Sequence, residues 1–379
     1  MSSTDQPTEA RFRPAGDGAN VVRVVPVYEE VLAFIEGSAG GRFEDLALAI
    51  FRHQVERCAP YRAYCESRGL DAATVTSWQA IPPVPIQAFK EATLSCGPAE
   101  RVFLSTGTTQ GGEKRSRHAM PDLRLYRASA LASTRSLFLP DVERIRLVSL
   151  IAPSSRRPES SLAQMVAWAA EAFADGAMVE AAPAGEPDFD VFTDCLRRSE
   201  RDGTPLAILT TTAALIGFFD HVRMHSLAFR LPHGSRLMDT GGGKGAPRPM
   251  SRKGLLHAVW NTLAIPGYFV ANEYGMAELS SQYWDSVIRD RHDGVHRPRT
   301  LLARPWLRTL VLDPITLEPL GSGSAGLLCH FDLANAGTAM AVLSEDVGVD
   351  VGYGLRVTGR APRAEARGCS LGVTEERVG

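Results

Sequence analysis

The sequence predicts an α/β fold in which a mostly parallel sheet is flanked by helices and followed by a small β-rich region. Between about residues 145 and 225, apolar strand-like runs alternate with segments of helical periodicity, as in strands joined by helical crossovers. After Trp306 the pattern changes to short strands separated by turn residues, which indicates antiparallel pairing. An apolar share of 44% and a charged share of 22% allow a sizeable hydrophobic core.

The first elements are predicted to be helices. Between about residues 27 and 70, apolar side chains recur at helical spacing, and residues 37–41 separate two helices. One helical stripe is expected in the core and consists of Phe43, Leu46, Ile50 and Phe51. The proline-rich segment AIPPVPIQAFKEA is then extended and leads to a turn or short helix that carries Phe89 and Lys90.

The middle of the chain begins with a short strand, AERVFL, which runs directly into the loop STGTTQGGEK at residues 105–114. A helix is expected to follow, starting near Asp122. Three further strands are predicted in RIRLVSLIAP, AMVEAAP and PLAILTTT. The helices between and after them are predicted in SSLAQMVAWAAEAFA, DFDVFTDCLRRSER and AALIGFFDHVRMH.

We divide the chain into three parts: a flexible tail at 1–22, an α/β core at 23–305, and a β-rich subdomain with a short C-terminal tail at 306–379. The first residues lack the basic-then-apolar pattern of a signal peptide. The longest apolar run, PLAILTTTAALIGFFDHV, is too short and too rich in hydroxyl groups to span a membrane.

Charge and cysteine content narrow the possible functions. The net charge of −2 gives no general attraction to nucleic acid or to an anionic membrane. The six cysteines form no Cys-x-x-Cys pair, which argues against a disulfide scaffold or a structural zinc site. A reducing cytoplasm is the expected location.

The loop from Ser105 to Lys114 is the first candidate site. It contains four hydroxyl side chains and three glycines, a composition that suits neither a core nor a regular element. Glycines let a backbone approach a ligand closely, and amides and hydroxyls can donate to phosphate oxygens. Gly107 and Gly112 have the spacing of a Walker A loop, but Glu113 stands where lysine is required, so that motif is excluded. Considered alone, such a segment suits a plain surface loop as well as it suits a phosphate-binding loop.

Three later segments also carry reactive or flexible residues. MDTGGGKG, at 238–245, is a second glycine-rich turn after a short strand and contains Lys244. NEYGMAELSSQYWD, at 272–285, combines a tyrosine, a glycine and two glutamates. LSEDVGVDVGYGLRVTGRA, at 343–361, carries Asp346 and Arg360. Only four of the 41 basic residues are lysines, and Lys90 and Lys244 suit solvated positions as well as a grip on a phosphate or carboxylate.

The order of these motifs resembles that of the adenylate-forming superfamily of acyl and aryl acid ligases. More closely, PPVPIQAFKEA, STGTTQGGEKRSRH, MDTGGGKG and NEYGMAELSSQYWD are similar to the LuxE-like acyl-protein synthetases, which work beside the fatty acid reductase of bacterial luminescence operons. The likeness runs from about Val27 to the end of the chain. It implies a large adenylate-forming N-terminal domain whose mobile C-terminal lid is absent or truncated, because only a short tail follows Arg360.

The resemblance also implies roles for individual residues. Tyr274 would lie beside the adenine of ATP, Glu278 would hold Mg²⁺, and Asp346 would bind the ribose hydroxyls with help from Arg360. The phosphates of ATP would be held by Ser105, Thr106, Gly107, Thr108, Thr109 and Lys114. In the family a glycine usually follows the paired threonines, whereas this chain has Gln110. Because no lysine follows Lys253, the positive charge for adenylation would come from Lys114, Lys244 or an arginine.

The implied reaction joins a carboxylic acid, expected to be a fatty acid, to AMP with release of pyrophosphate. In LuxE-like proteins a cysteine near the C-terminus then receives the acyl group as a thioester, and Cys369 is the one candidate in the last forty residues. Arg367 nearby favours its thiolate. The expected partner is an acyl reductase or a carrier protein.

Other interpretations stay open. Without the resemblance, Cys369 suits a passive thiol, Glu278 a solvated helix charge and Asp346 a turn cap. One alternative function is a ligase that delivers the acyl group to coenzyme A or to a carrier-protein thiol. Another is a non-catalytic partner subunit of a reductase or synthase, which the missing lid and the altered loop favour.

Overall fold

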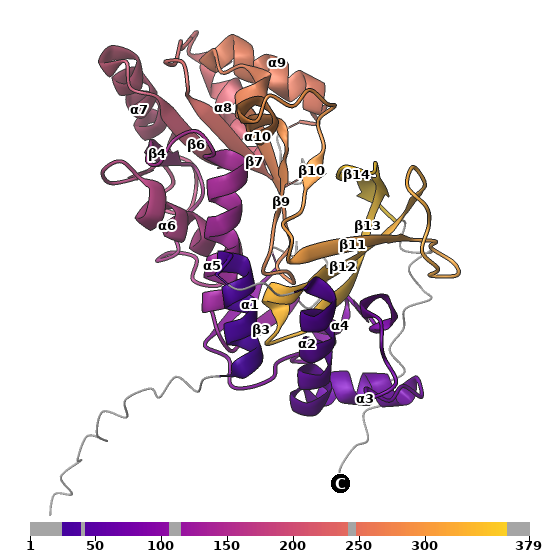
Figure 1. Ribbon diagram of the computed structural model, residues 1–379. Helices are drawn as coiled ribbons and strands as arrows, with labels where there is room; N and C mark the ends of the chain where they lie inside the picture. The colour runs from indigo at the N-terminus through magenta and orange to yellow at the C-terminus, as the bar shows by residue number, and fades with distance from the viewer. Residues whose placement is uncertain (1–24, 39–41, 106–114, 242–247, 362–379) are drawn as a thin grey trace, which may run out of the picture.

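The computed structural model describes residues 25–38, 42–105, 115–241 and 248–361. Within these residues, twelve strands form one large sheet with the order β11-β12-β13-β14-β10-β9-β8-β7-β6-β4-β5, and β1 pairs with β13 off this path. Figure 1 shows helices on both sides of the sheet, so the predicted α/β fold is confirmed. None of the helices in these residues has the length and apolarity needed to cross a membrane.

One half of the sheet is parallel, as predicted from the alternating pattern. Its strands are β4 (Arg146–Ser149), β5 (Val179–Glu180), β6 (Leu206–Thr211), β7 (Arg236–Thr240) and β8 (Val270–Tyr274). The crossover helices are α6 (Ser161–Phe173), α7 (Phe189–Asp202), α8 (Thr212–Met224) and α9 (Arg252–Leu263). Each begins behind a side-chain cap, from Ser160, Asp188, Thr211 and Ser251. These caps fix where the four helices start.

The other half of the sheet is antiparallel. It joins the parallel half where β8 pairs with β9, so the sheet is continuous across the change in direction. Its strands are β9 (Tyr283–Asp285), β10 (Leu301–Leu302), β11 (Leu307–Leu312), β12 (Ala325–Asp332), β13 (Ala341–Asp350) and β14 (Leu355–Arg360). A short helix, α10 (Val287–His292), connects β9 to β10. The antiparallel pairing predicted after Trp306 is confirmed.

The N-terminal helices pack against the antiparallel strands, as Figure 1 shows for α2 and α4 beside β11 to β13. They are α1 (Pro26–Glu36), α2 (Phe43–Arg57), α3 (Ala59–Ser67) and α4 (Ala88–Glu91). The predicted stripe of α2 is buried in this core. A second core lies between the parallel strands and their helices. Residues 27–94 therefore share a core with residues 301–361, and a division of the chain at residue 305 stays a proposal.

The region around the 105–114 loop differs from the prediction. The strand β2 (Arg101–Leu104) does not lead through the loop to a helix, because β3 (Arg117–Met120) comes first and pairs with β2 as an antiparallel hairpin. The helix α5 (Arg124–Ser133) then starts two residues after Asp122 and continues into a π-helical turn at Thr134–Phe138. Upstream, the proline-rich segment forms the two-residue strand β1 (Val84–Pro85) before α4.

Candidate functional site

Five of the predicted site residues lie in the described part of the chain: Ser105, Tyr274, Glu278, Asp346 and Arg360. They come from three separate regions, the β2–β3 hairpin, the end of β8 with the segment after it, and the β13–β14 hairpin. The other predicted site residues lie outside the described residues; they are Thr106, Gly107, Thr108, Thr109, Lys114, Lys244 and Cys369.

Tyr274, Asp346 and Arg360 are in direct contact. Asp346 on β13 stands opposite Arg360 on β14 in the antiparallel ladder, and Arg360 Nε donates to Asp346 Oδ1 at 3.1 Å. The hydroxyl of Tyr274 donates to Asp346 Oδ2 at 2.8 Å. Burial and the nearby charge of Asp346 raise the pKa of Tyr274. Each carboxylate oxygen of Asp346 therefore has one donor and a remaining lone pair, which suits a further bond to a ligand hydroxyl.

Glu278 is a buried carboxyl group, with 3% of its surface exposed. Burial raises its pKa, while a hydrogen bond from the hydroxyl of Ser116 and the charges of Arg360 and Lys90 act in the opposite direction. Its carbonyl oxygen accepts a hydrogen bond from Asn335 Nδ2 at 2.9 Å. Glu278 is thus influenced by two basic side chains from different parts of the chain.

The two ends of the 105–114 loop are held together by Ser105 and Ser116. The amide of Ser105 donates to the Ser116 carbonyl at 3.1 Å, and the amide of Ser116 donates to Ser105 Oγ at 3.0 Å. Arg115 Nε donates to the carbonyl of Ser105. Since Ser116 also bonds to Glu278, the base of this loop and the predicted metal ligand are neighbours.

His118 positions the segment that carries Glu278, although no feature of the sequence identifies it. It is fully buried on β3, where Nδ1 donates to the carbonyl of Ala277 at 2.8 Å and Nε2 accepts from the hydroxyl of Thr338 at 2.9 Å. Burial lowers its pKa to about 4, so the ring is neutral at pH 7. His118 therefore connects the hairpin of the 105–114 loop to the residue before Glu278.

Asp332 and Asn335 hold the residues that follow Glu278. Asp332 Oδ2 accepts from the amides of Ser280 and Ser281 at 3.0 and 2.8 Å, and Asn335 Oδ1 accepts from the amide of Ser280 at 2.9 Å. The Ser281 hydroxyl donates to Asp332 Oδ1 at 2.6 Å. The amides of Ser280 and Ser281 thus donate to side chains, whereas in a strand they would donate to the carbonyl groups of a neighbouring strand.

The second glycine-rich turn begins beside the end of β8. Asp239 on β7 accepts from Asn272 Nδ2 at 3.2 Å through Oδ2, and it also pairs with Arg252. The hydroxyl of Thr212 lies 2.9 Å from Asp239 Oδ2 and 2.8 Å from the carbonyl oxygen of Gly241. These contacts bring the start of the turn to the carboxyl ends of the parallel strands, the edge where α/β sheets commonly bind ligands.

Glu273 is a second buried carboxyl group in the same segment. It is 4% exposed and accepts a hydrogen bond from the hydroxyl of Thr240. Burial, together with the charge of Asp239, raises its pKa to about 7, against the effect of the Thr240 bond. A Cβ atom at Gly275 would lie 2.5 Å from Glu273 Oε1, so any larger residue there would have to displace the Glu273 carboxylate. Glu273 is therefore packed where its ionised form is poorly solvated.

We expect Glu273→Gln to stabilise the fold increasingly as pH rises. Between its ordinary pKa of 4.5 and its folded pKa of about 7, the folded chain keeps a proton that the unfolded chain has lost, so wild-type stability falls with rising pH. The variant escapes this loss, which amounts to about 3 kcal/mol at full effect. Urea unfolding at pH 5, 6.5 and 8 measures it. Exposed Glu318→Gln is the control, and a pH-independent difference between Glu273→Gln and the wild type would contradict the assignment.

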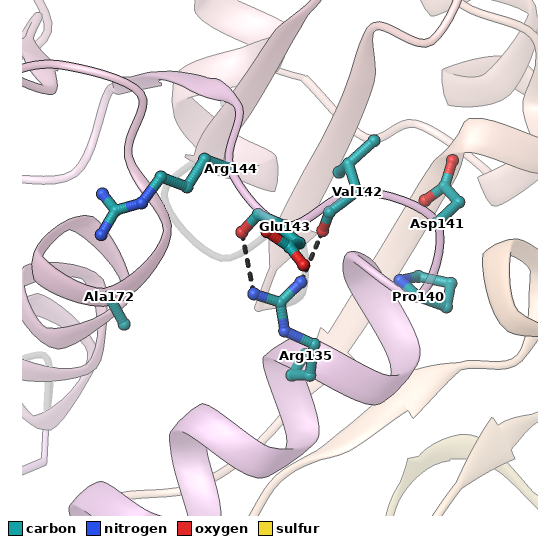
Figure 2. Close-up of a pocket in the computed structure, with 7 residues that line it drawn as sticks. All are labelled: Arg135, Pro140, Asp141, Val142, Glu143, Arg144 and Ala172. Atoms are coloured by element: carbon teal, nitrogen blue, oxygen red, sulfur yellow. Dashed lines mark hydrogen bonds between the residues drawn. The ribbon is translucent and has the colours of Figure 1, made fainter.

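A cavity of about 530 Å³ lies away from these groups in the fold. It is lined by Arg135, Pro140, Asp141, Val142, Glu143, Arg144 and Ala172. Figure 2 shows Arg135 directed at the backbone between Val142 and Glu143, where it donates to both carbonyl oxygens. None of the predicted site residues lines this cavity, and the guanidinium of Arg135 is already hydrogen-bonded to the backbone. The candidate site is therefore defined by the contacts around Glu278 and Asp346.

The donor set fits a magnesium nucleotide. In the described ranges, no cluster of three or more His, Cys, Asp or Glu side chains could hold a metal by itself. Mg²⁺ commonly takes one or two carboxylates and completes its shell with phosphates and water. Glu278 is a single buried carboxylate, and Asp346 has free acceptor capacity for a further donor. The residues present therefore fit a metal that arrives with its nucleotide.

Comparison with known proteins gives one family match. The family model described as "Acyl-protein synthetase, LuxE" matches residues 30–377. A search of curated proteins finds no match.

Solved structures of a 2-hydroxyisobutyryl-CoA ligase share the fold, and a lower-scoring match is an amide bond synthetase. A 2-hydroxyisobutyryl-CoA ligase in the postadenylation state has 18% identity and a TM-score of 0.60, with coverage of 84% of this chain and 67% of the ligase. The same ligase in the thioesterification state has 16% identity and a TM-score of 0.60, covering 89% and 69%. Amide bond synthetase McbA from Marinactinospora thermotolerans has 17% identity and a TM-score of 0.45, covering 68% and 48%. This chain thus spans about half of the synthetase and about two thirds of the ligase.

Proposed function

Because the chain belongs to the LuxE acyl-protein synthetase family, we propose that it activates a carboxylic acid with ATP and passes the acyl group to a protein cysteine. The observation that carries this proposal is that Tyr274, Asp346 and Arg360 are in direct contact, while Glu278 is bonded to Ser116 at the end of the 105–114 loop and is influenced by the charge of Arg360. The β8 segment with Tyr274 and Glu278 and the β13–β14 hairpin with Asp346 and Arg360 are far apart in the sequence, and each of these residues suits one part of a nucleotide.

The nucleoside end of ATP would bind at Asp346. Its two oxygens accept from Tyr274 and Arg360, and their remaining lone pairs would accept the ribose hydroxyls. The ring of Tyr274, held in place through its hydroxyl, would lie against the adenine. Arg360 has 55% of its side chain exposed, so it can shift toward a phosphate while Asp346 retains the bond to Tyr274.

The phosphate end would lie between Glu278 and the 105–114 loop. Ser105, Thr106, Gly107, Thr108, Thr109 and Lys114 are the proposed phosphate ligands, with Lys244 approaching from the second glycine-rich turn. Mg²⁺ held by Glu278 would offset charge on the phosphate oxygens. The bond from Ser116 ties the Glu278 carboxylate to the residues that follow the loop.

The first reaction transfers AMP to the acid. An oxygen of the substrate carboxylate forms a bond to the α-phosphorus, and the bond from that phosphorus to its bridging oxygen breaks. Pyrophosphate leaves with the electron pair, and no proton is transferred. The residues of the site therefore act by positioning the reactants and by offsetting negative charge, and a general base is unnecessary.

The second reaction transfers the acyl group to sulfur, and Cys369 is the proposed acceptor. Its thiolate would attack the acyl carbonyl, a C–S bond would form, and AMP would leave with the electron pair of the C–O bond. The resulting thioester would be delivered to an acyl reductase or similar partner. We propose a fatty acid as the substrate. We also propose a cytoplasmic location, which is supported by the free thiols of the described cysteines.

Acid-dependent exchange of labelled pyrophosphate into ATP tests the first reaction. The purified chain is incubated with ATP, magnesium, labelled pyrophosphate and carboxylic acids of increasing chain length. We expect exchange that depends on both acid and magnesium, with a maximum at one chain length. If a chain with native circular dichroism leaves ATP unlabelled with every acid, the proposed function is wrong.

A further inference from the structure

The segment that carries Lys90 is inserted beside the strand of Asp346. Strand β1 pairs with β13 in parallel, with Val84 opposite Val342 and Pro85 opposite Leu343. The amide of Ile86 extends this pairing by donating to the carbonyl of Leu343 at 2.9 Å. The chain therefore enters α4, and reaches Lys90, next to the part of β13 that leads to Asp346.

Two side chains connect α4 to the surroundings of the site. Gln87 donates to the carboxylate of Glu345, the residue before Asp346. Phe89 is fully buried, and its ring packs edge-on against His118 with centroids 5.6 Å apart. His118 in turn holds the carbonyl of Ala277, the residue before Glu278. The short helix is thus tied to both acidic residues of the site through their immediate neighbours.

Lys90 lies near Glu278 as a result. It is partly buried and directly follows Phe89, whose ring packs against His118, and the bond from His118 to Ala277 links this turn to the residue before Glu278. Lys90 and Lys253 are the lysines in the described ranges, and Lys253 is exposed on α9. Lys90 is therefore the lysine that this part of the fold delivers to the candidate site.

We propose that Lys90 supplies the positive charge that offsets the negative charge of the α-phosphate as the substrate carboxylate approaches it. This inference rests on the proposed function and assigns a residue to its first step. The attacking oxygen and the α-phosphate are both negatively charged, so they repel each other until the P–O bond forms. A cation held beside them by a fixed backbone lowers this barrier without having to reorganise. An ammonium group is a compact charge that suits such a confined position.

Three variants test the assignment after wild-type exchange has been measured. Lys90→Ala is expected to lower acid-dependent pyrophosphate exchange by about tenfold to a hundredfold. This reduction is smaller than that expected for a fully enclosed donor, because Lys90 is partly exposed. Lys90→Arg, which keeps the charge, is expected to retain more activity than Lys90→Ala. Lys253→Ala, which removes an exposed lysine, is the matched control and is expected to equal the wild type.

Two further readouts separate this role from a structural one. Titration calorimetry with ATP and magnesium is expected to give a severalfold larger Kd for Lys90→Ala and an unchanged Kd for Lys253→Ala. Consumption of a synthetic acyl adenylate in the second reaction is expected to be unaffected by Lys90→Ala, because pyrophosphate has already left.

The proposal and its premise fail in different ways. Absence of exchange in the folded wild type contradicts the proposed function. Normal wild-type exchange with exchange by Lys90→Ala within threefold of it contradicts the role of Lys90 alone. An unchanged Kd for ATP also overturns that role. Equal losses of rate in the two reactions overturn it as well, because a disturbed fold would impair both steps alike.

Discussion

Replacing Glu278 with glutamine is expected to lower acid-dependent pyrophosphate exchange by about 100- to 1,000-fold, the range found when a buried group that stabilises charge in a transition state is lost. Glutamine keeps the shape and can still accept from Ser116, but it has no charge for magnesium. Because burial raises the pKa of Glu278, removing its charge is not expected to destabilise the fold. The loss should therefore be confined to catalysis.

Exchange rates measured over a range of magnesium concentrations test this expectation. The variant is expected to need more magnesium for half-maximal rate, because it lacks one ligand of the metal. Glu180→Gln, at an exposed glutamate on the edge strand β5, is the matched control. An exchange rate for Glu278→Gln within threefold of the wild type, with the same magnesium dependence, would rule out the metal-ligand role.

Local patterns predict the helices and the parallel strands of this fold. The apolar stripe from Phe43 to Phe51 has helical spacing and identifies α2, and strand β6 begins with the apolar run LAIL. The contact of Asp346 with Arg360 is also local, since the two residues are fourteen apart on one hairpin and face each other across it. The helices and parallel strands follow from periodicity, which is visible in one sequence, whereas the shared role of Asp346 and Arg360 was implied by the family resemblance.

Short and long-range features were not predictable in this way. Strand β3 has four residues, RHAM, and no alternation of apolar and polar side chains, so the loop was expected to lead straight to a helix. Gln87 and Glu345 are 258 residues apart, and only the pairing of β1 with β13 brings them together. The position of Lys90 depends on that pairing. Likewise, the buried environment of Glu273 arises from packing against β7, which its own sequence neighbours do not reveal.

Replacing Cys369 with alanine is expected to abolish covalent labelling of the protein by radioactive acid and ATP, while pyrophosphate exchange continues. The acyl-protein synthetase function requires a thiolate acceptor on the chain itself, and alanine cannot form a thioester. Labelling is measured by gel radiography before and after hydroxylamine, which cleaves thioesters. Cys96→Ala is the control, because Cys96 is the most exposed of the described cysteines, although it is partly buried and this burial raises the pKa of its thiol.

The same measurement separates the three candidate functions. A ligase that uses coenzyme A or a carrier protein would make acyl thioesters of those acceptors in both wild type and Cys369→Ala, with no hydroxylamine-sensitive label on the chain. A non-catalytic partner subunit would give neither label nor exchange, even with a reductase present. If Cys369→Ala keeps the label while Cys96→Ala loses it, the acceptor is misassigned but the acyl-protein chemistry stands. Pyrophosphate exchange depends on the first reaction alone, whereas covalent labelling of the chain depends on both reactions. The two measurements together therefore show which reaction is absent in each alternative function.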